Sequence, residues 1–180
     1  DQCASAFGGI VIIEADKQLI RPRRFIANPE YIEYIQDNLL MGFDGVSRSS
    51  QVAAKSIKSS IIDKRKSELL SELSFLSNEG VDLFVKEATI DKHAEITKKI
   101  RTIKMILNGD NKIKKIQEMI ERTEDLGSLC TRFMGAGGGG FFMCWAPKYT
   151  HKDIKNSLNI KTWVDVKFSR NGSQIIFAES

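Results

Sequence analysis

The stretch that decides the fold is CTRFMGAGGGGFFMCWAP, residues 130–147. Five of the chain's 13 glycines fall within the six positions 135–140. The residues on either side, SLCTRFM and GFFMCWA, are apolar, aromatic and sulfur-bearing, a composition typical of strands. The pattern predicts a strand, a glycine loop and a second strand.

A glycine loop can hold phosphate, because residues without Cβ reach positive φ and turn several backbone N–H groups toward an anion. Gly135, Gly137 and Gly140 satisfy G-x-G-x-x-G, but that dinucleotide fingerprint needs a helix to begin at its third glycine. FFMCWAP follows instead, which argues against it. A Walker A loop is excluded, because no Lys-Ser or Lys-Thr follows. An anion-binding hairpin loop and a hairpin tip without ligand remain, and the tip is disfavoured because ordering contiguous glycines costs entropy.

The composition predicts a soluble chain with one or two hydrophobic cores. The hydrophobic content is 42%, and the length of 180 residues exceeds the roughly 100–150 residues of a common domain. Basic and acidic residues are mixed, and a net charge of +4 suits anionic small molecules but is too mild for nucleic acid. Cys3, Cys130 and Cys144 have no metal-ligand spacing and predict free, buried thiols in a reducing cytoplasm. No apolar stretch reaches the ~18 residues of a membrane span. We therefore predict a cytoplasmic protein without nucleic acid or membrane partners.

Strand patterns lie at both ends of the chain and helical patterns lie between them. A short helix and a turn precede the first strand. Asn78-Glu79-Gly80 predicts a break between the first two long helices. The predicted strands are residues 10–13, 38–45, 128–134 and 140–146, with an irregular edge strand at 18–25, and the predicted long helices are 47–77, 81–107 and 111–126.

The C-terminal part predicts a short helix and a hairpin. Residues 150–158 are helical, with Thr150 as N-cap and Asp153 in the first turn. Residues 162–169, the Asn171-Gly172 turn and residues 173–178 predict two paired strands. The fold class is α+β, an antiparallel sheet packed with helices.

Three segments together resemble the GHMP kinases, the family of galactokinase, homoserine kinase, mevalonate kinase and phosphomevalonate kinase. MGAGGGGFF (134–142) resembles the third signature motif of the family. DQCASAFGG (1–9) is similar to the segment around the catalytic aspartate of the sugar-kinase branch. LLMGFDGVSRSS (39–50) is similar to the strand, turn and arginine-bearing helix start of bacterial D-glycero-D-manno-heptose 7-phosphate kinases. Order and spacing match from residue 1 to about residue 173.

The resemblance implies the C-terminal portion of a kinase, because no segment resembles the family's N-terminal ATP loop. Residues 1–37 would end the N-terminal kinase domain, and residues 38–180 would form the C-terminal, ferredoxin-like domain. ATP and Mg²⁺ are the implied cofactors, with the Mg²⁺ ligands outside this chain. A sugar or sugar phosphate and the N-terminal half of the kinase are the implied partners, and a homodimer stays open.

The same resemblance assigns the site residues. Asp1 would be catalytic, by orienting or accepting the proton of the attacking hydroxyl. Ser47 and Arg48 would bind the substrate, although Arg48 could also be an exposed arginine on a solvated helix. The predicted nucleotide-binding residues are Gly135, Ala136, Gly137, Gly138, Gly139 and Gly140.

The alternative function is a non-catalytic ligand-binding or regulatory domain derived from a GHMP kinase. Met134, where relatives usually carry Ser or Thr, and the absent ATP loop favour it, whereas Asp1 and the glycine run oppose it. A nucleic-acid module is a third, weaker hypothesis, because the lysine-rich helices lack interleaved aromatic residues. His93 and His151 are predicted to lie on the surface. The aromatic residues Phe141, Phe142, Trp145 and Trp163 are predicted to lie in the core.

Overall fold

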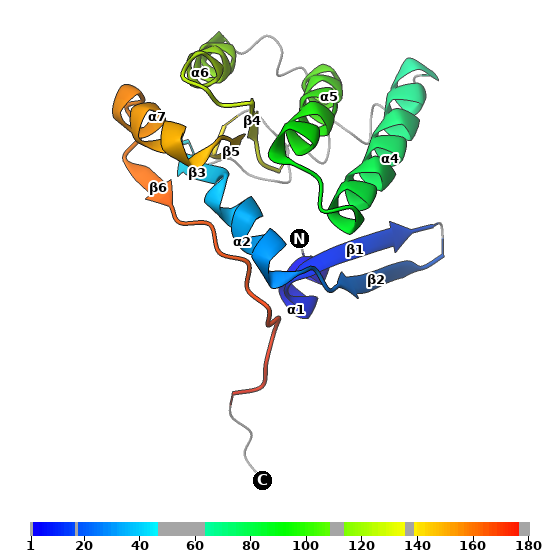
Figure 1. The fold of residues 1–180 in the computed structure, drawn as a ribbon. Helices are drawn as coiled ribbons and strands as arrows, with labels where there is room; N and C mark the ends of the chain where they lie inside the picture. The colour runs from blue at the N-terminus through cyan, green and yellow to red at the C-terminus, as the bar shows by residue number, and fades with distance from the viewer. Residues whose placement is uncertain (1, 17, 47–63, 109–113, 136–138, 177–180) are drawn as a thin grey trace. The chain divides into compact units, whose positions relative to one another are not determined.

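The computed structural model describes residues 2–16, 18–46, 64–108, 114–135 and 139–176 (Figure 1). The chain divides into two compact units, residues 1–36 with 167–180 and residues 37–166. The C-terminal residues thus group with the N-terminal ones. The predicted assignment of residues 1–37 and 38–180 to two kinase domains stays a prediction.

The first unit contains helix α1 (Gln2–Phe7) and an antiparallel ribbon of strands β1 (Ile10–Ala15) and β2 (Ile20–Phe25), followed by helix α2 (Pro29–Asp37). The first predicted strand is confirmed. Pro22 lies opposite Ile13 in the ribbon. Proline is tolerated in β2 because this strand is an edge of a two-stranded sheet, as the sequence predicts.

The predicted C-terminal hairpin is wrong, because residues 167–176 form no strand. They pack along α1 instead: the Gly9 N–H donates to the Ser169 carbonyl at 2.6 Å, and the Ser173 N–H donates to the Ser5 carbonyl at 3.1 Å. A Cβ on Gly8 would lie 2.3 Å from the backbone carbon of Asn171. The Asn-Gly pair therefore serves a close contact between two backbones rather than a hairpin turn.

The second unit is built on one four-stranded antiparallel sheet with strand order β4-β5-β3-β6. Along the chain, a strand is followed by helices, two strands, a helix and a last strand, which is the ferredoxin-like order. The predicted α+β class and its antiparallel sheet are confirmed. The strands are β3 (Leu39–Phe43), β4 (Cys130–Phe133), β5 (Phe141–Trp145) and β6 (Thr162–Val164), and the helices are α4 (Lys64–Val85), α5 (Ile90–Asn108), α6 (Lys114–Asp125) and α7 (His151–Ser157), which follows the 3-10 turn η2 (Lys148–Thr150).

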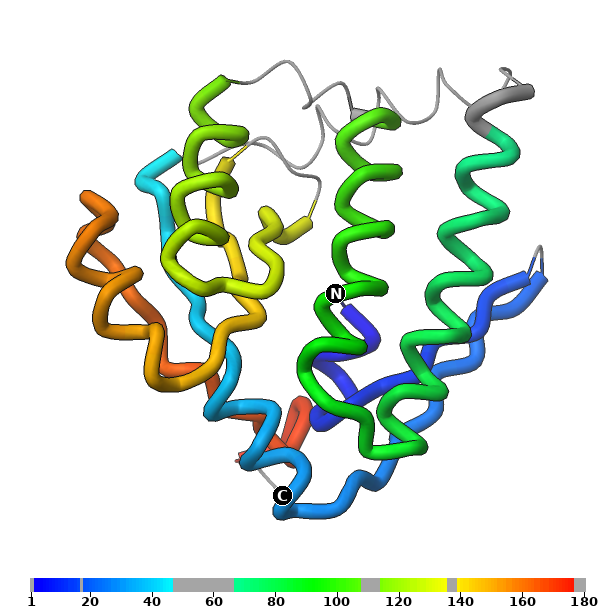
Figure 2. Tube along the Cα trace, turned by 45° about the horizontal axis from the view of Figure 1, so that its top comes forward, coloured from blue at the N-terminus to red at the C-terminus, as the bar shows by residue number. Residues whose placement is uncertain are grey.

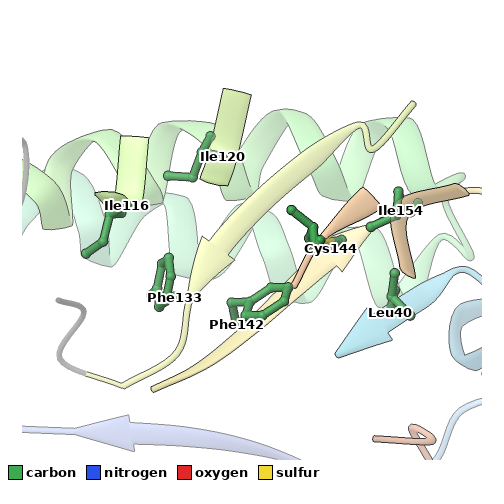
Figure 3. Packing of buried hydrophobic residues seen from close by; sticks show 9 residues of the cluster. Leu40, Ile116, Ile120, Phe133, Phe142, Cys144 and Ile154 are labelled. Carbon is green, nitrogen blue, oxygen red and sulfur yellow. The ribbon is translucent and has the colours of Figure 1, made fainter. Parts of the chain in front are cut away.

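The core of this unit lies between the sheet and helices α6 and α7 (Figure 3). Strands alternate their side chains between two faces, so Leu40 of β3 and Phe142 of β5 point into this core and are 3% and 0% exposed. The helices contribute isoleucines at helical spacing, as the sequence predicts. The buried cluster is Leu40, Ile116, Ile120, Phe133, Phe142, Cys144, Ala146, Ile154 and Leu158.

The predicted helix break at residues 78–80 is wrong, because α4 continues through Gly80 to Val85. The chain turns at residues 86–89, where Glu87 has a φ of 50° and the Ala88 N–H donates to the Leu83 carbonyl at 3.0 Å. Helices α4 and α5 then run side by side (Figures 1 and 2). A glycine inside a helix costs only about 1 kcal/mol, which packing against a neighbouring helix offsets.

Two predicted helix ends are settled by the structure. Gly127 has a φ of 98° just after α6, and the Ser128 N–H donates to the Thr123 carbonyl at 3.0 Å, so the predicted C-terminal cap is confirmed. Asp153 lies in the first turn of α7, as predicted. The predicted cap by Thr150 is wrong, since its hydroxyl donates to the Pro147 carbonyl at 2.8 Å.

Two glycine substitutions should change stability in opposite directions. Gly42→Ala places a Cβ 2.7 Å from Phe142 Cζ and 3.1 Å from Trp163 Cε3, and such overpacking destabilises by about 1–3 kcal/mol. Gly80→Ala meets no atom within 4 Å inside α4 and should stabilise by about 0.5–1 kcal/mol. Urea unfolding of both variants measures the two effects, and a destabilised Gly80→Ala would contradict the continuous α4.

Candidate functional site

The glycine loop joins β4, an edge strand of the four-stranded sheet, to its neighbour β5. The Met134 N–H donates to the Phe141 carbonyl at 2.7 Å and closes the base of the loop. The described glycines Gly135, Gly139 and Gly140 have φ values of 63°, 134° and 100°. L residues with a side chain rarely adopt these values, which explains why glycine occupies these positions.

Asp44 holds the C-terminal end of this loop. Its Oδ1 accepts the Gly140 N–H at 2.9 Å and the Val46 N–H at 2.8 Å, and its own N–H donates to the Gly140 carbonyl at 3.1 Å. A Cβ on Gly139 would lie 3.2 Å from Asp44 Oδ2 and 3.3 Å from Val46 Cβ. The turn after β3 and the glycine loop, 96 residues apart in sequence, therefore form one local structure.

Sequence reasoning missed Asp44 as a site residue. The Asp44-Gly45 pair forms a turn: Gly45 has a φ of 85°, and Asp44 accepts the N–H two residues ahead. The hydrogen bond to Gly140 carried no signal in sequence, because it depends on β3 pairing with β5. Since this bond occupies the Gly140 N–H, that donor is not available to an anion in the structure.

Several predicted site residues lie outside the described residues: Asp1, Ser47, Arg48 and Ala136 to Gly138. Their roles stay predictions. Val46 is the last described residue before Ser47, and it lies against the end of the glycine loop. The structure thus brings the segment that leads to Ser47 and Arg48 to the glycine loop.

The aromatic side chains around the loop divide between the two faces of the sheet. Phe142 and Trp145 are buried as predicted, and Trp163 is half-buried. The core prediction is wrong for Phe141, which is 47% exposed. Phe141 follows the loop on the face opposite to Phe142, where its ring lies 5.0 Å from that of Phe43, its cross-strand partner. An aromatic pair, exposed at Phe141 and half-buried at Phe43, therefore flanks the loop.

A polar network fastens β4, the strand that leads into the loop. The Arg101 guanidinium of α5 donates to Glu124 of α6 and, at 2.7 Å, to the Thr131 carbonyl. Glu124 also accepts the Thr131 N–H at 3.2 Å. The buried Thr131 hydroxyl is 2.7 Å from that of Thr123. Because buried polar groups with satisfied partners rigidify their surroundings, β4 presents the loop from a fixed base.

The predicted free thiols are confirmed, and so is the burial of Cys130 and Cys144, whereas the predicted burial is wrong for Cys3, which is half-buried. Burial raises the pKa of Cys130 and that of Cys144 to about 11. Both remain thiols at neutral pH, and thiols are poor nucleophiles and metal ligands. Among the described residues, no group of three or more His, Cys, Asp or Glu side chains could hold a metal ion.

The surface prediction is wrong for His93, which is 4% exposed. Its ring stacks on Trp145 with centroids 5.0 Å apart and meets the Phe84 ring edge-on at 4.9 Å. Desolvation by burial lowers the pKa of His93 to about 4. His151 is half-buried, with Nε2 2.9 Å from the Ala146 carbonyl oxygen.

The fold matches solved structures of small-molecule kinases, whereas no protein-family model and no curated protein matches the sequence. D-glycero-D-manno-heptose 1-phosphate kinase from Bacteriodes thetaiotaomicron matches with a TM-score of 0.62 and 17% identity, over 96% of this chain and 46% of that chain. Mevalonate kinase from L. major matches with a TM-score of 0.64 and 10% identity, over 88% and 48%. Mevalonate kinase from Methanococcus jannaschii matches with a TM-score of 0.57 and 14% identity, over 78% and 42%.

The chain has the fold of the C-terminal domain of GHMP kinases. It spans about half the length of the kinases that it matches. The predicted fold is therefore confirmed. In this chain the glycine loop connects strands β4 and β5 of the sheet. None of the described helices is long and apolar enough to cross a bilayer.

Replacing Asp44 should release the end of the glycine loop. Asp44→Ala removes the acceptor of two backbone N–H groups, and hydrogen bonds to a charged group contribute about 1.5–3 kcal/mol each when buried and less when solvated. We expect faster amide hydrogen exchange at Gly140 and Val46. Asp44→Asn keeps an oxygen acceptor and should retain most of the protection. Unchanged exchange in Asp44→Ala would contradict the observed contact.

Acidification should weaken the second unit through His93. Folding lowers the pKa of His93 from 6.5 to about 4, so the unfolded chain binds more protons between these values. The contribution of neutral His93 is therefore complete above about pH 6.5 and is lost as the pH falls toward 4. A shift of this size corresponds to roughly 3 kcal/mol.

Urea unfolding at several pH values measures this contribution. Carboxylates titrate in the same range, so the difference between the native chain and His93→Gln, which does not titrate, isolates the histidine. That difference should shrink as the pH falls. A difference independent of pH would show that His93 protonates equally well in both states.

Proposed function

We propose that the chain is the C-terminal portion of an ATP-dependent kinase. This kinase transfers the γ-phosphoryl group of ATP to a hydroxyl of a sugar or sugar phosphate, with heptose 7-phosphate favoured. The observation that carries the proposal is the glycine loop, with positive φ at each described glycine, held by Asp44 within the kinase fold. The heptose 1-phosphate kinase among the structural neighbours supports a sugar phosphate as the substrate class.

The loop geometry suits phosphoryl transfer, which requires positioning and donors around spreading negative charge more than covalent chemistry. Among the described residues, no hydrogen bond occupies the N–H of Gly135 or of Gly139. These amides can donate to a phosphoryl oxygen. A donor held in place before the reaction is worth more than one that reorients during it, and the contacts of Asp44 and β4 supply this order.

The remaining roles follow the family resemblance. Asp1 orients or accepts the proton of the attacking hydroxyl, and Ser47 and Arg48 bind the substrate's anionic group. ATP supplies the phosphoryl group. Mg²⁺ neutralises the phosphate charge when bound, through ligands outside this chain.

A non-catalytic ligand-binding domain is the second candidate, and two observations favour it. Met134 offers no hydroxyl at the start of the loop, where the family usually carries one. The Asp44 carboxylate also lies beside the loop and occupies the Gly140 N–H, which leaves one donor fewer for a phosphate. Such a domain would bind a phosphorylated ligand without turning it over.

Coupled ADP release with heptose 7-phosphate, galactose and mevalonate distinguishes the two candidates. The assay compares this chain with a longer protein, which contains this chain and the residues encoded upstream of Asp1. We expect turnover of one substrate by the longer protein and none by the chain alone.

Asp1→Asn should lower kcat of the longer protein by about 10²–10⁴-fold, the usual contribution of a positioned base. Asp165→Asn is the matched control, because Asp165 is exposed and should leave kcat unchanged. Absence of turnover with every substrate and nucleotide, together with retained ligand binding, would favour the non-catalytic domain.

A further inference from the structure

An exposed aromatic ring follows directly after the glycine loop. Phe141 is the first residue of β5, and it is 47% exposed. Its carbonyl accepts the Met134 N–H at 2.7 Å, and the Gly140 carbonyl before it accepts the Asp44 N–H at 3.1 Å. Its cross-strand partner is Phe43 of β3. Because the chain on both sides holds this backbone, the ring projects from an ordered part of the sheet.

The face of the sheet that carries Phe141 becomes more exposed toward the glycine loop. Alternate residues of a strand share one face, so Met143 and Trp145 lie on the same face as Phe141. Trp145 is buried, and its indole N–H donates to the Thr97 hydroxyl of α5 at 2.9 Å. Met143 is half-buried. Helix α5 therefore covers the far end of this face, whereas the end beside the loop is accessible.

Apolar side chains occupy this accessible end. The rings of Phe43 and Phe141 lie 5.0 Å apart at an interplanar angle of 44°. Met134, whose N–H binds Phe141 from the other side, is 36% exposed. Contact between such side chains and water is unfavourable, and ligand sites are lined mainly by apolar and aromatic side chains with a few polar groups. The loop end of this face has that composition.

A carboxylate lies at the same end of the strands. Asp44 directly follows Phe43, and it accepts the N–H of Gly140, the residue before Phe141. Asp44 is half-buried, so its charge is felt at this surface. A carboxylate repels phosphate groups, whereas it has about four acceptor sites for neutral donors such as hydroxyl groups. This end of the sheet therefore suits the hydroxyl-bearing part of a ligand rather than a polyphosphate.

A sugar ring matches both the aromatic ring and the carboxylate. The C–H groups on one face of a pyranose are slightly positive, and the face of an aromatic ring is negative. The hydroxyl groups at the rim of the sugar donate to a carboxylate. A nucleobase could also stack on Phe141, but it would bring the phosphates of ATP toward Asp44. The combination of the two side chains favours the sugar.

We infer that Phe141 is a specificity-determining residue that packs against the C–H face of the sugar substrate, with Asp44 directing the sugar hydroxyl groups to this end of the glycine loop. The inference rests on the proposed function and names the residues that recognise the sugar. Phe43 supports the ring from the neighbouring strand and is a positioning residue. Recognition then depends on the aromatic character of residue 141 and not only on its apolarity.

NMR of the whole chain and of the longer protein tests this contact with galactose and heptose 7-phosphate as probes. Nuclear Overhauser effects should connect the sugar C–H protons to the ring protons of Phe141. Phe141→Leu should weaken sugar binding by about 2–10-fold, the size of an aromatic contact. Phe75→Leu is the matched control, because Phe75 is an exposed aromatic residue of α4, and it should leave binding unchanged. Absence of sugar contacts to the Phe141 ring in both proteins would overturn the inference.

Asp44→Asn tests the carboxylate without releasing the loop. The variant keeps an oxygen acceptor for the N–H groups of Val46 and Gly140, but it removes the negative charge. Galactose should bind more weakly, because a charged acceptor is stronger than a neutral one. Inorganic phosphate should bind more tightly, because the repulsion is gone. Weaker binding of both probes would show that Asp44 only orders the loop and would overturn its assigned role.

Kinetics of the longer protein separate this inference from the proposed function. Phe141→Leu should raise KM for the sugar and leave KM for ATP unchanged. A raised KM for ATP alone would assign the ring to the nucleobase and overturn the inference. ADP release with an unchanged KM for the sugar rejects this inference and retains the kinase proposal. Sugar contacts to the Phe141 ring without ADP release from any substrate support the inference and reject phosphoryl transfer.

Discussion

The site depends on one contact, the hydrogen bond between the Asp44 carboxylate and the N–H of Gly140. A run of glycines has the largest conformational entropy to lose on ordering, and it has no side chains with which to pack. The carboxylate supplies the missing anchor from outside the loop. The same carboxylate oxygen also accepts the Val46 N–H, so it holds the turn after β3 together with the loop. The register of β3 on β5 brings Phe43 opposite Phe141 and thereby places Asp44 beside Gly140.

The second support of the loop lies beneath its other end. Strand β4 is one of the two edge strands of its sheet, and an edge strand has only one neighbouring strand to hold it. The Arg101 guanidinium and the Glu124 carboxylate bind the Thr131 carbonyl and N–H from two different helices. Side chains thus take over the hydrogen bonds that a further strand would make. This blocks pairing with another chain at that edge and also fixes Arg132, which follows directly in the strand.

Two basic side chains of α5, Arg101 and His93, are removed from water, and the cost of burial is offset in a different way for each. Arg101 has a carboxylate partner, which offsets the cost of its burial. His93 avoids that cost by remaining neutral between two aromatic rings. Burial also raises the pKa of the Cys130 and Cys144 thiols. Both stay protonated at neutral pH, and the proposed function gives neither of them a role.

The sequence by itself determined the α+β class, the strands on either side of the glycines, the isoleucine faces of the helices and the need for glycine at positive φ. These depend on periodicity and on the sterics of single residues, which act over short range. Tertiary structure alone decided that α4 continues through Gly80, that Asn171-Gly172 packs on α1, and that His93 is buried while Phe141 is exposed. It alone also brought Asp44 to Gly140. Such pairings join residues far apart in the chain, and their energies depend on strand register and helix packing that no local pattern specifies.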